Sequence, residues 1–352
     1  MVTIYLYGGL GNQMFQYAFA KFLESKGFAV ALEATHFLPE SKEAFGLANA
    51  SAGIGGGEGQ DTRDLELAHF AITLPILSKP ELFSHFYGCD RWFWFFRIYH
   101  KFMRIAPKPL YQILQALLPS NRKSHPYKST ITEAKLGEAI PLHSITSDTR
   151  VFGYYGNLSY IKGLKEILRR DFTCPLTPAN RNLQAQIQAT PNATFIHIRR
   201  GDYLRLWQYL ELGKAYYECA ITQVLKALGG GVHFFVFSND IAWCKQEFLG
   251  LLDRDVYAGC SFSFIDNNDE SNPTQELMLM RSCQHAITAN STFSWWAAYL
   301  IENPHKIVIM PSIHLLDEPD CTINIMPDDW IVLNPTWGNQ VCQRAQLNKS
   351  GF

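Results

Sequence analysis

Residues 2–32 read VTIYLYGGLGNQMFQYAFAKFLESKGFAVAL, and this stretch decides the fold class. β-Branched and aromatic residues alternate over 2–7, which predicts a strand, and the glycine-rich segment 8–11 predicts a tight turn. The amphipathic run 12–26 predicts a helix, and the apolar run 28–32 predicts a second strand. A strand, a turn, a helix and a strand in this order indicate the opening unit of an α/β domain with a parallel sheet.

The second half of the chain repeats this alternation. Predicted strands lie at 193–198, 232–237, 285–288, 306–310 and 330–333, and predicted helices lie near 214–228, 240–251, 274–283 and 294–302. The pattern indicates a second doubly wound α/β domain. Pro and Asn residues cluster over 171–191, which is typical of a linker. We therefore expect an α/β protein with two domains, residues 1–180 and residues 181–352.

Composition excludes several classes of protein. The chain has 352 residues, 31 basic and 32 acidic side chains and a net charge of −1, which excludes a globally basic nucleic-acid binder. The eight cysteines form no CxxC pair, which argues against a disulfide scaffold or a zinc site and favours a reducing compartment. We expect no signal peptide and no membrane-spanning segment, so the predicted location is the cytoplasm.

One segment departs from this near-neutral average. Residues 91–130 hold eight Lys or Arg residues, no Asp or Glu, and many aromatic side chains. We interpret it as a basic, aromatic helical insertion in the first domain. Its basic face is either solvated or lies peripherally on the inner face of an anionic membrane.

The first candidate site follows the strand predicted over 193–198. On a strand His197 and Arg199 share a face, and Arg200 points the other way. Open α/β sheets bind ligands at the carboxyl ends of their strands, and the guanidinium of Arg199 matches pyrophosphate oxygens. We expect Arg200 to be a structural partner of Asp202 or of a nearby loop. A simple Arg–Asp ion pair is the alternative interpretation of the motif.

Two further polar segments follow predicted strands. Residues 290–294, Asn-Ser-Thr-Phe-Ser, open a predicted helix, where hydroxyl groups cap the helix or, with the free N–H groups, bind a phosphate. Asn239 and Asp240 can accept hydrogen bonds from a base or from ribose hydroxyls. A plain helix cap is the alternative for this second segment.

The first glycine turn also resembles a dinucleotide-binding fingerprint, with Glu33 near the place of a ribose-binding acid. That interpretation would make the protein an NAD-dependent oxidoreductase, but Met14 replaces the third glycine. We expect Asn12 and Gln13 to point into a cleft. The triplet 253–255, Asp-Arg-Asp, is of a kind that holds divalent metals, yet its charged surroundings are typical of a solvated turn. We therefore expect neither a metal nor a cofactor.

Taken together, four motifs resemble those of the bacterial α-1,2-fucosyltransferases, in the same order, from residue 8 to about 334. They are GLGNQMFQ at 9–16, HIRRGDY at 197–203, FSND at 237–240 and NSTFSWW at 290–296. The resemblance implies a GT-B architecture, with two Rossmann-like domains facing each other across a cleft. It implies inverting, metal-independent transfer of L-fucose from GDP-β-L-fucose to the 2-hydroxyl of a terminal β-galactose. The implied partners are GDP-fucose and a galactose-terminated oligosaccharide, free or lipid-linked.

The resemblance also implies residue roles, with Arg199 on the β-phosphate and either Asn239 or Asp240 on the guanosine. The residues implied to face the nucleotide-sugar donor are His197, Arg199, Asn239, Asp240, Asn290, Ser291, Thr292, Phe293 and Ser294. The residues expected on the acceptor side are Asn12, Gln13, Glu33 and His36. Asp202 is the candidate general base or an orienting group for an arginine, and Glu33 and His36 are alternatives. A non-catalytic glycan-binding module that displays 200–202, Arg-Gly-Asp, is a further alternative.

Overall fold

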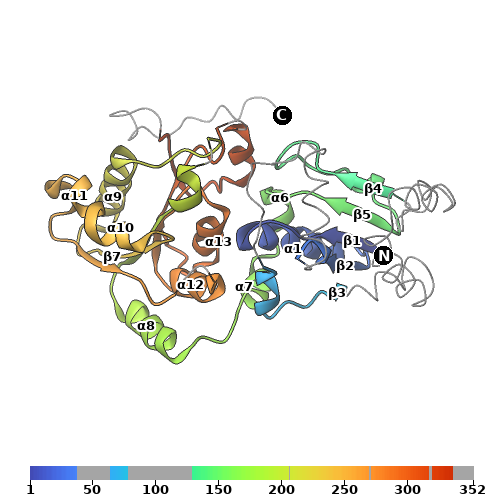
Figure 1. The fold of residues 1–352 in the computed structure, drawn as a ribbon, viewed down its shortest axis with the longest axis horizontal. Coiled ribbons are helices and arrows are strands. Elements are labelled where there is room, and N and C mark those ends of the chain that lie inside the picture. The colour runs from blue at the N-terminus through green and yellow to red at the C-terminus, as the bar shows by residue number, and fades with distance from the viewer. Residues whose placement is uncertain (38–63, 78–128, 206, 269–270, 317–318, 336–352) are drawn as a thin grey trace, which may run out of the picture.

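A computed structural model of the chain describes residues 1–37, 64–77, 129–205, 207–268, 271–316 and 319–335. Two parallel sheets make up its framework, one from the first half of the chain and one from the second (Figure 1). The expected insertion at 91–130 lies outside the described residues, apart from its last two positions. Within the described ranges, no helix is long and apolar enough to cross a bilayer.

The first sheet has five strands in the order β3-β2-β1-β5-β4. They are β1 (Val2–Tyr5), β2 (Val30–Glu33), β3 (Ile76–Leu77), β4 (Ser129–Thr132) and β5 (Thr149–Phe152). Helix α1 (Leu10–Ser25) joins β1 to β2, as the sequence predicts. The turn before it needs Gly8, whose φ is +76°. The strand order reverses between β1 and β5, and the crevice at such a reversal is where α/β sheets bind ligands.

The second sheet has six strands in the order β11-β10-β9-β6-β7-β8. They are β6 (Ala193–Ile198), β7 (His233–Ser238), β8 (Ser261–Phe264), β9 (His285–Ile287), β10 (Val308–Pro311) and β11 (Ile331–Leu333). Numbered along the chain, this is the doubly wound order 3-2-1-4-5-6, whose reversal lies between β6 and β9. Two parallel α/β domains therefore confirm the expected fold class.

Helices fill the connections. Those of the second domain are α9 (Lys214–Leu228), α10 (Ile241–Trp243), α11 (Leu249–Leu251), α12 (Pro273–Met280) and α13 (Thr292–Leu300). A π-helical turn at Cys244–Phe248 separates α10 from α11, where the sequence predicts one helix. In α9, Cys219 is disulfide-bonded, which the spread of the cysteines did not predict.

The segment between the two sheets is more regular than expected. It holds α6 (Leu158–Ile161), α7 (Lys165–Asp171) and α8 (Pro178–Ala189). The linker predicted over 171–191 is thus helical over most of its length. Thr177 caps α8 by accepting a hydrogen bond from Asn180 N at 3.2 Å, and Pro178 occupies the first helical turn, where proline is tolerated.

The two domains are in direct contact through α1 and α13. A Cβ atom at Gly11 would lie 2.5 Å from the backbone nitrogen of Phe293, so only glycine permits this approach. The indole N–H of Trp296 donates to the Gly11 carbonyl at 3.0 Å, and the Phe15 ring lies 4.8 Å from that of Trp296. The apolar core is therefore continuous from α1 into α13.

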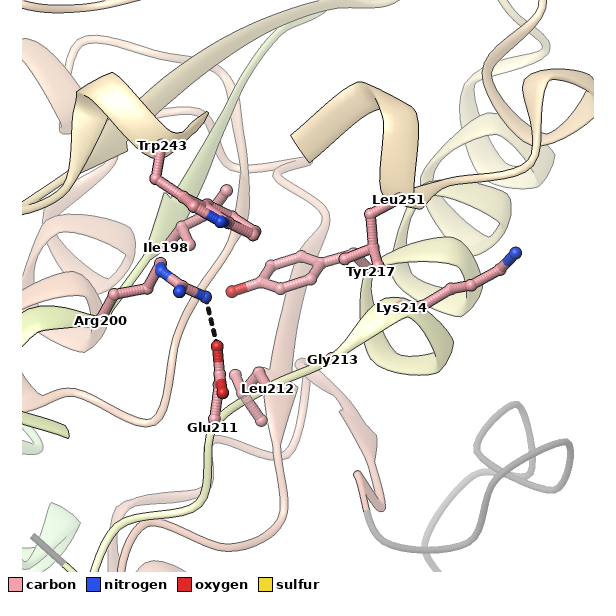
Figure 2. Close-up of a pocket in the computed structure, with 9 residues that line it drawn as sticks. All are labelled: Ile198, Arg200, Glu211, Leu212, Gly213, Lys214, Tyr217, Trp243 and Leu251. Carbon is pink, nitrogen blue, oxygen red and sulfur yellow. Dashed lines mark hydrogen bonds and ion pairs between the residues drawn. The ribbon is translucent and has the colours of Figure 1, made fainter. Parts of the chain in front are cut away.

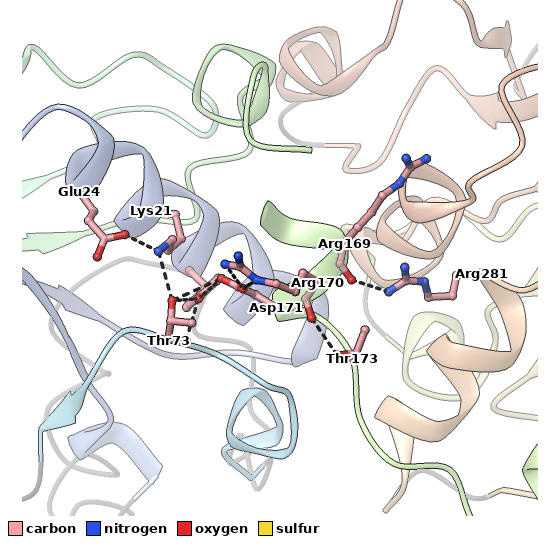
Figure 3. A network of polar contacts seen from close by, with 9 residues as sticks. Lys21, Glu24, Thr73, Arg169, Arg170, Asp171, Thr173 and Arg281 are labelled. Atoms are coloured by element: carbon pink, nitrogen blue, oxygen red, sulfur yellow. Dashed lines mark hydrogen bonds and ion pairs between the residues drawn. The ribbon is translucent and has the colours of Figure 1, made fainter. Parts of the chain in front are cut away.

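A polar network on α7 reinforces this contact (Figure 3). The fully buried carboxylate of Asp171 accepts hydrogen bonds from Tyr17 Oη at 2.6 Å and from Arg170 at 2.8 and 2.9 Å. On the other side of α7, the guanidinium of Arg281, which directly follows α12, donates to the carbonyl of Phe172, which directly follows α7, at 2.9 Å. Helix α7 is thus tied to α1 of the first domain and to α12 of the second.

Replacing Asp171 by alanine is expected to lower the free energy of unfolding by about 2–4 kcal/mol, because the buried Tyr17 hydroxyl loses its acceptor. Urea titration of both proteins measures the difference. Glu166→Ala is the control, since that carboxylate is 80% exposed and its removal should change little. Equal effects of the two substitutions would contradict the role of the network.

Candidate active site

The four sequence motifs meet where the two domains touch. The hydroxyl of Thr292 donates to Asn12 Oδ1 at 3.0 Å, which joins the start of α13 to the start of α1. The His197 ring, at the end of β6, lies 5.7 Å from that of Phe293. Arg200 N donates to Asn239 Oδ1 at 2.9 Å, which brings in the end of β7. The site expected from separate motifs is thus one continuous region at the β6–β9 reversal.

His197 is buried and uncharged at neutral pH. Burial, and to a lesser extent the charge of Arg199, lowers the pKa of His197 to about 3. Its Nδ1 atom has no hydrogen-bond partner among the described residues. His197 therefore contributes a neutral imidazole beside Arg199 and not a second positive charge.

This burial makes stability depend on pH. In the unfolded chain His197 takes up a proton as the pH falls below about 6.5, whereas in the folded chain it stays neutral down to about 3. The contribution of His197 to the free energy of unfolding is therefore fully present above pH 6.5. It falls by about 1.4 kcal/mol per pH unit as the pH is lowered from 6.5 toward 3. His314, whose pKa burial lowers to about 4, acts in the same direction.

In His197→Asn, the loss of unfolding free energy between pH 7 and pH 5 should be smaller than in the wild type by about 2 kcal/mol. Urea titrations at the two pH values measure it. The matched control is His143→Asn, at an exposed position, which should keep the wild-type difference. An unchanged difference in His197→Asn would show that His197 is not a buried neutral group.

Arg199 is linked through Tyr203 to the turn that precedes α13. Its guanidinium carbon is 5.3 Å from the centre of the Tyr203 ring, and the Tyr203 hydroxyl donates to the Asn290 carbonyl at 3.2 Å. Ser291 precedes the first turn of α13 with extended backbone and makes no side-chain capping bond. A guanidinium next to an uncapped helix start is suited to bind a phosphate, because both are positive and both donate hydrogen bonds.

Two other residues of the 290–294 turn form hydrogen bonds with backbone groups of the protein. The Asn290 amide donates to the Leu210 carbonyl at 2.9 Å. Ser294 is fully buried, and its Oγ accepts from Ala289 N at 3.2 Å. The Asn290 amide nitrogen and the Ser294 hydroxyl therefore have backbone partners within the protein, and their expected place facing the nucleotide-sugar donor stays a prediction.

Asn239 and Asp240 also have protein partners. Asn239 supports the turn at Arg200, as described above. Asp240 Oδ1 caps α10 by accepting from Trp243 N at 3.3 Å, and its Oδ2 accepts from Arg200 Nε at 3.4 Å. The structure thus shows the helix cap, and a guanosine contact of Asn239 or Asp240 stays a prediction.

Arg200 has structural partners in nearby loops, one of the two arrangements expected for it. Besides Asp240, it forms an ion pair with Glu211, and its guanidinium carbon lies 3.8 Å from the centre of the Trp243 ring. Its side chain is only 16% exposed, so the Arg-Gly-Asp tripeptide is not displayed as an adhesion motif. The side chain of Asp202, the candidate base, lies outside the described part of the structure.

Gln13 does not face a cleft. Its side chain is fully buried, its amide nitrogen donates to the carbonyls of Gly8 and Asp64 at 2.9 and 3.0 Å, and its oxygen accepts from Leu67 N at 3.0 Å. It therefore fixes backbone segments to α1, which corrects the expected acceptor role.

Glu33 is a poor candidate for the general base. Arg150 holds it from two guanidinium nitrogens, with 2.7 Å from Nε, and Thr35 donates to it at 2.6 Å. Both carboxylate oxygens are thus occupied. His36 lies nearby, with its Nδ1 3.5 Å from the Tyr5 hydroxyl, at the carboxyl edge of the first sheet.

The motifs did not predict a pair of tyrosines at the same edge of the first sheet. The Tyr7 and Tyr154 rings, which follow β1 and β5, lie 4.6 Å apart. Glu133 fixes this loop by accepting from Tyr154 N at 2.7 Å. Aromatic faces bind sugar rings well, and the signal was the Tyr-Tyr pair at 154–155.

The other two candidate sites have structural explanations. The glycine turn at 8–11 packs closely against Phe293 at Gly11. A dinucleotide could therefore not approach the turn at this glycine. In the Asp-Arg-Asp triplet, Asp253 forms a surface ion pair with Lys214 at 2.7 Å, which agrees with a solvated turn.

Comparison with known proteins supports the resemblance seen in the motifs. A profile of "Glycosyl transferase family 11" matches residues 145–333, more than half of the chain. An α-1,2-colitosyltransferase of Escherichia coli is 29% identical over 94% of this chain and 98% of its own length. The O-antigen biosynthesis glycosyltransferase WbnK of E. coli is 29% identical over 87% and 92%.

Among solved structures, Arabidopsis thaliana FUT1 in complex with GDP has a TM-score of 0.44 at 12% identity, over 87% of this chain and 69% of that one. The family match covers the whole second sheet and the motifs at its carboxyl edge, where Arg199 and the start of α13 lie. The chain therefore belongs to glycosyl transferase family 11 and is a glycosyltransferase.

Proposed function

We propose that this enzyme transfers L-fucose from GDP-β-L-fucose to the 2-hydroxyl of a terminal β-galactose, with inversion at the fucose C1. The observation that carries the proposal is that Tyr203 links Arg199, after β6, to the turn before α13 at the β6–β9 reversal. The start of α13 in turn contacts α1 of the first domain through Thr292 and Asn12. Family membership and the α-1,2 linkage named for the colitosyltransferase support it.

The proposed chemistry follows from this arrangement. The bond between C1 of fucose and the GDP oxygen lengthens first, and negative charge grows on the β-phosphate while C1 gains oxocarbenium character. Arg199 and the N–H groups at the start of α13 stabilise that charge. The galactose 2-hydroxyl attacks the opposite face and gives up its proton, for which Asp202 is our candidate base. Attack from that face converts the β-linked donor into an α-linked product.

We further propose that no divalent metal is needed, since Arg199 and the helix start supply the positive charge that a metal would. Transfer should then persist in excess EDTA. Loss of activity that Mn²⁺ restores would contradict this and return attention to Asp253 and Asp255.

We assign donor binding to residues 181–352 and acceptor binding to residues 1–180, whose sheet edge carries Tyr7, Tyr154 and His36. Residues 91–130 are rich in basic and aromatic side chains and hold no acidic ones, which supports a peripheral contact with the inner face of a membrane. From this cytoplasmic position the enzyme would reach lipid-linked acceptors.

A panel assay tests the proposal. The enzyme is incubated with GDP-fucose, GDP-colitose, GDP-mannose or UDP-galactose and a set of β-galactosides. We expect turnover with GDP-fucose. Because a relative is a colitosyltransferase, GDP-colitose, which lacks the 3-hydroxyl of fucose, is the informative competitor. Faster transfer of colitose than of fucose would contradict the proposed donor.

A further inference from the structure

Exposed apolar side chains gather on the loop that joins β6 to α9 and directly beside it. Within the described ranges four large apolar side chains are exposed, and three of these are Leu204, Trp207 and Leu316. Leu204 and Trp207 belong to the β6–α9 loop, and Leu316 N donates to the Gln208 carbonyl of that loop at 2.8 Å. Trp207 is the most exposed, at 71%. Single exposed apolar residues are common, but a group of them that includes a tryptophan marks a binding surface.

The β6–α9 loop is held closed at its base. Figure 2 shows that Arg200, at its start, forms an ion pair with Glu211, near its end. Between these two residues the Tyr203 ring stacks on the Tyr209 ring, with their centres 3.9 Å apart. Compact loops whose ends meet are frequently functional, and a loop fixed in this way loses little conformational entropy when a ligand packs on it. Trp207 is therefore displayed on a preorganised loop.

The same loop is attached to the turn that precedes α13. The Tyr203 hydroxyl donates to the Asn290 carbonyl at 3.2 Å, and the Asn290 amide donates to the Leu210 carbonyl at 2.9 Å. The guanidinium carbon of Arg199 lies 5.3 Å from the centre of the Tyr203 ring. The loop that carries Trp207 is thus fixed to the residues between which we place the leaving phosphate. Because Trp207 itself is open to solvent, it suits a part of the acceptor that lies beyond the reacting sugar.

The charges around Trp207 favour a neutral partner. Residues 203–210 contain one basic side chain, Arg205, whereas residues 312–320 contain three acidic side chains and no Lys or Arg. Burial lowers the pKa of His314, in the second of these segments, to about 4, so it adds no positive charge at neutral pH. An anionic membrane surface attracts basic segments, which this surface does not offer. A saccharide is neutral, and the C–H face of its ring packs well on an indole.

We propose that Trp207 is a platform for the sugar unit that precedes the terminal galactose of the acceptor. The inference rests on the proposed function, in which the acceptor is a galactose-terminated oligosaccharide. The galactose would lie between the proposed phosphate-binding turn and the tyrosines Tyr7 and Tyr154 of the first domain, and the preceding sugar would pack on the indole. Trp207 would thus make the enzyme prefer acceptors of two or more sugar units to a single galactose.

The test compares two acceptors with the same donor. One is methyl β-galactoside, and the other is the disaccharide used best among those that link β-galactose to glucose or to N-acetylglucosamine. In the wild type we expect kcat/KM to be roughly 10-fold higher for the disaccharide. Trp207→Ala should remove this preference by raising KM for the disaccharide roughly 10-fold, with kcat and both constants for methyl β-galactoside near wild type. Trp207→Phe keeps an aromatic face and should keep part of the preference.

Arg205→Ala, two positions away on the same loop, is the matched control and should keep the wild-type ratio of the two acceptors. Urea titration should show little change in Trp207→Ala, because removal of an exposed indole leaves no cavity. An unchanged ratio in Trp207→Ala, or equal losses with both acceptors, would contradict the platform, since a disturbed loop would affect both acceptors alike. An unchanged ratio combined with lost binding to phosphatidylglycerol vesicles would identify a lipid surface as the partner instead.

The comparison also separates this inference from the proposed function. An enzyme that transfers fucose to both galactosides but keeps its acceptor ratio in Trp207→Ala contradicts the platform alone. An enzyme that uses another nucleotide sugar but loses the ratio in Trp207→Ala supports the platform and contradicts the proposed donor. An enzyme that glycosylates neither galactoside contradicts both.

Discussion

Replacing Arg199 by alanine is expected to lower kcat/KM for fucosyl transfer by roughly 10³-fold, with little change in stability. The reason is that we place the leaving phosphate between Arg199 and the start of α13, which Tyr203 links to each other. Arg199→Lys keeps a positive charge but loses the planar fork of donors, so it should recover only part of the activity. Initial rates at several GDP-fucose concentrations measure both variants.

The matched control is Arg205→Ala, an exposed arginine in the loop that follows the same turn. It should keep near wild-type activity. If Arg199→Ala also kept a near wild-type kcat, the phosphate assignment would be wrong. Circular dichroism and urea titration verify that Arg199→Ala is folded, so that a loss of rate reports on chemistry.

Substitution of Gly11 by alanine is expected to damage both stability and catalysis. The new Cβ would lie 2.5 Å from the backbone nitrogen of Phe293 and from the Thr292 hydroxyl, and backbone cannot rotate away as a flexible side chain can. Such overpacking costs about 1–3 kcal/mol. Because α13 carries the proposed phosphate-binding turn, a shift of about 1 Å should also reduce kcat/KM by roughly 10²-fold.

Thermal unfolding and initial rates measure the two effects of Gly11→Ala. Gly250→Ala is the control, since a Cβ there meets no atom within 4 Å and should leave both quantities near wild type. A Gly11→Ala enzyme with wild-type stability and rate would mean that the close approach of α1 to α13 is not needed to assemble the site.

The fold could largely be predicted from the sequence because the long strands are mostly apolar. The strand predicted over 193–198 is β6, and all six of its residues are buried, as is usual in a parallel sheet covered on both faces. Strand β8 gives no such signal, because its four residues alternate serine and phenylalanine at the sheet edge. Helix α8 was missed because its Pro and Asn residues are typical of loops, although Thr177 and Pro178 are helix-start signals.

The sequence predicted which segments form the site, but it did not predict which of their side chains have partners within the protein. Three of the motifs follow strands of the second sheet and converge, because carboxyl ends of parallel strands meet at one edge of a sheet. The first motif, at 9–16, joins them through the contact of α1 with α13. Whether a polar residue there faces a ligand depends on partners distant in sequence. Glu33 pairs with Arg150, 117 positions away, and Gln13 binds Leu67, 54 positions away. No local pattern contains those pairings.

The most direct test of the central claim is the structure of the product made from GDP-β-L-fucose and a β-galactoside. Its linkage and anomeric configuration are determined by nuclear magnetic resonance. The proposed function predicts a single product with α-fucose on the 2-hydroxyl of the terminal galactose. A β-linked product, attachment at another hydroxyl, or no transfer of fucose would contradict it.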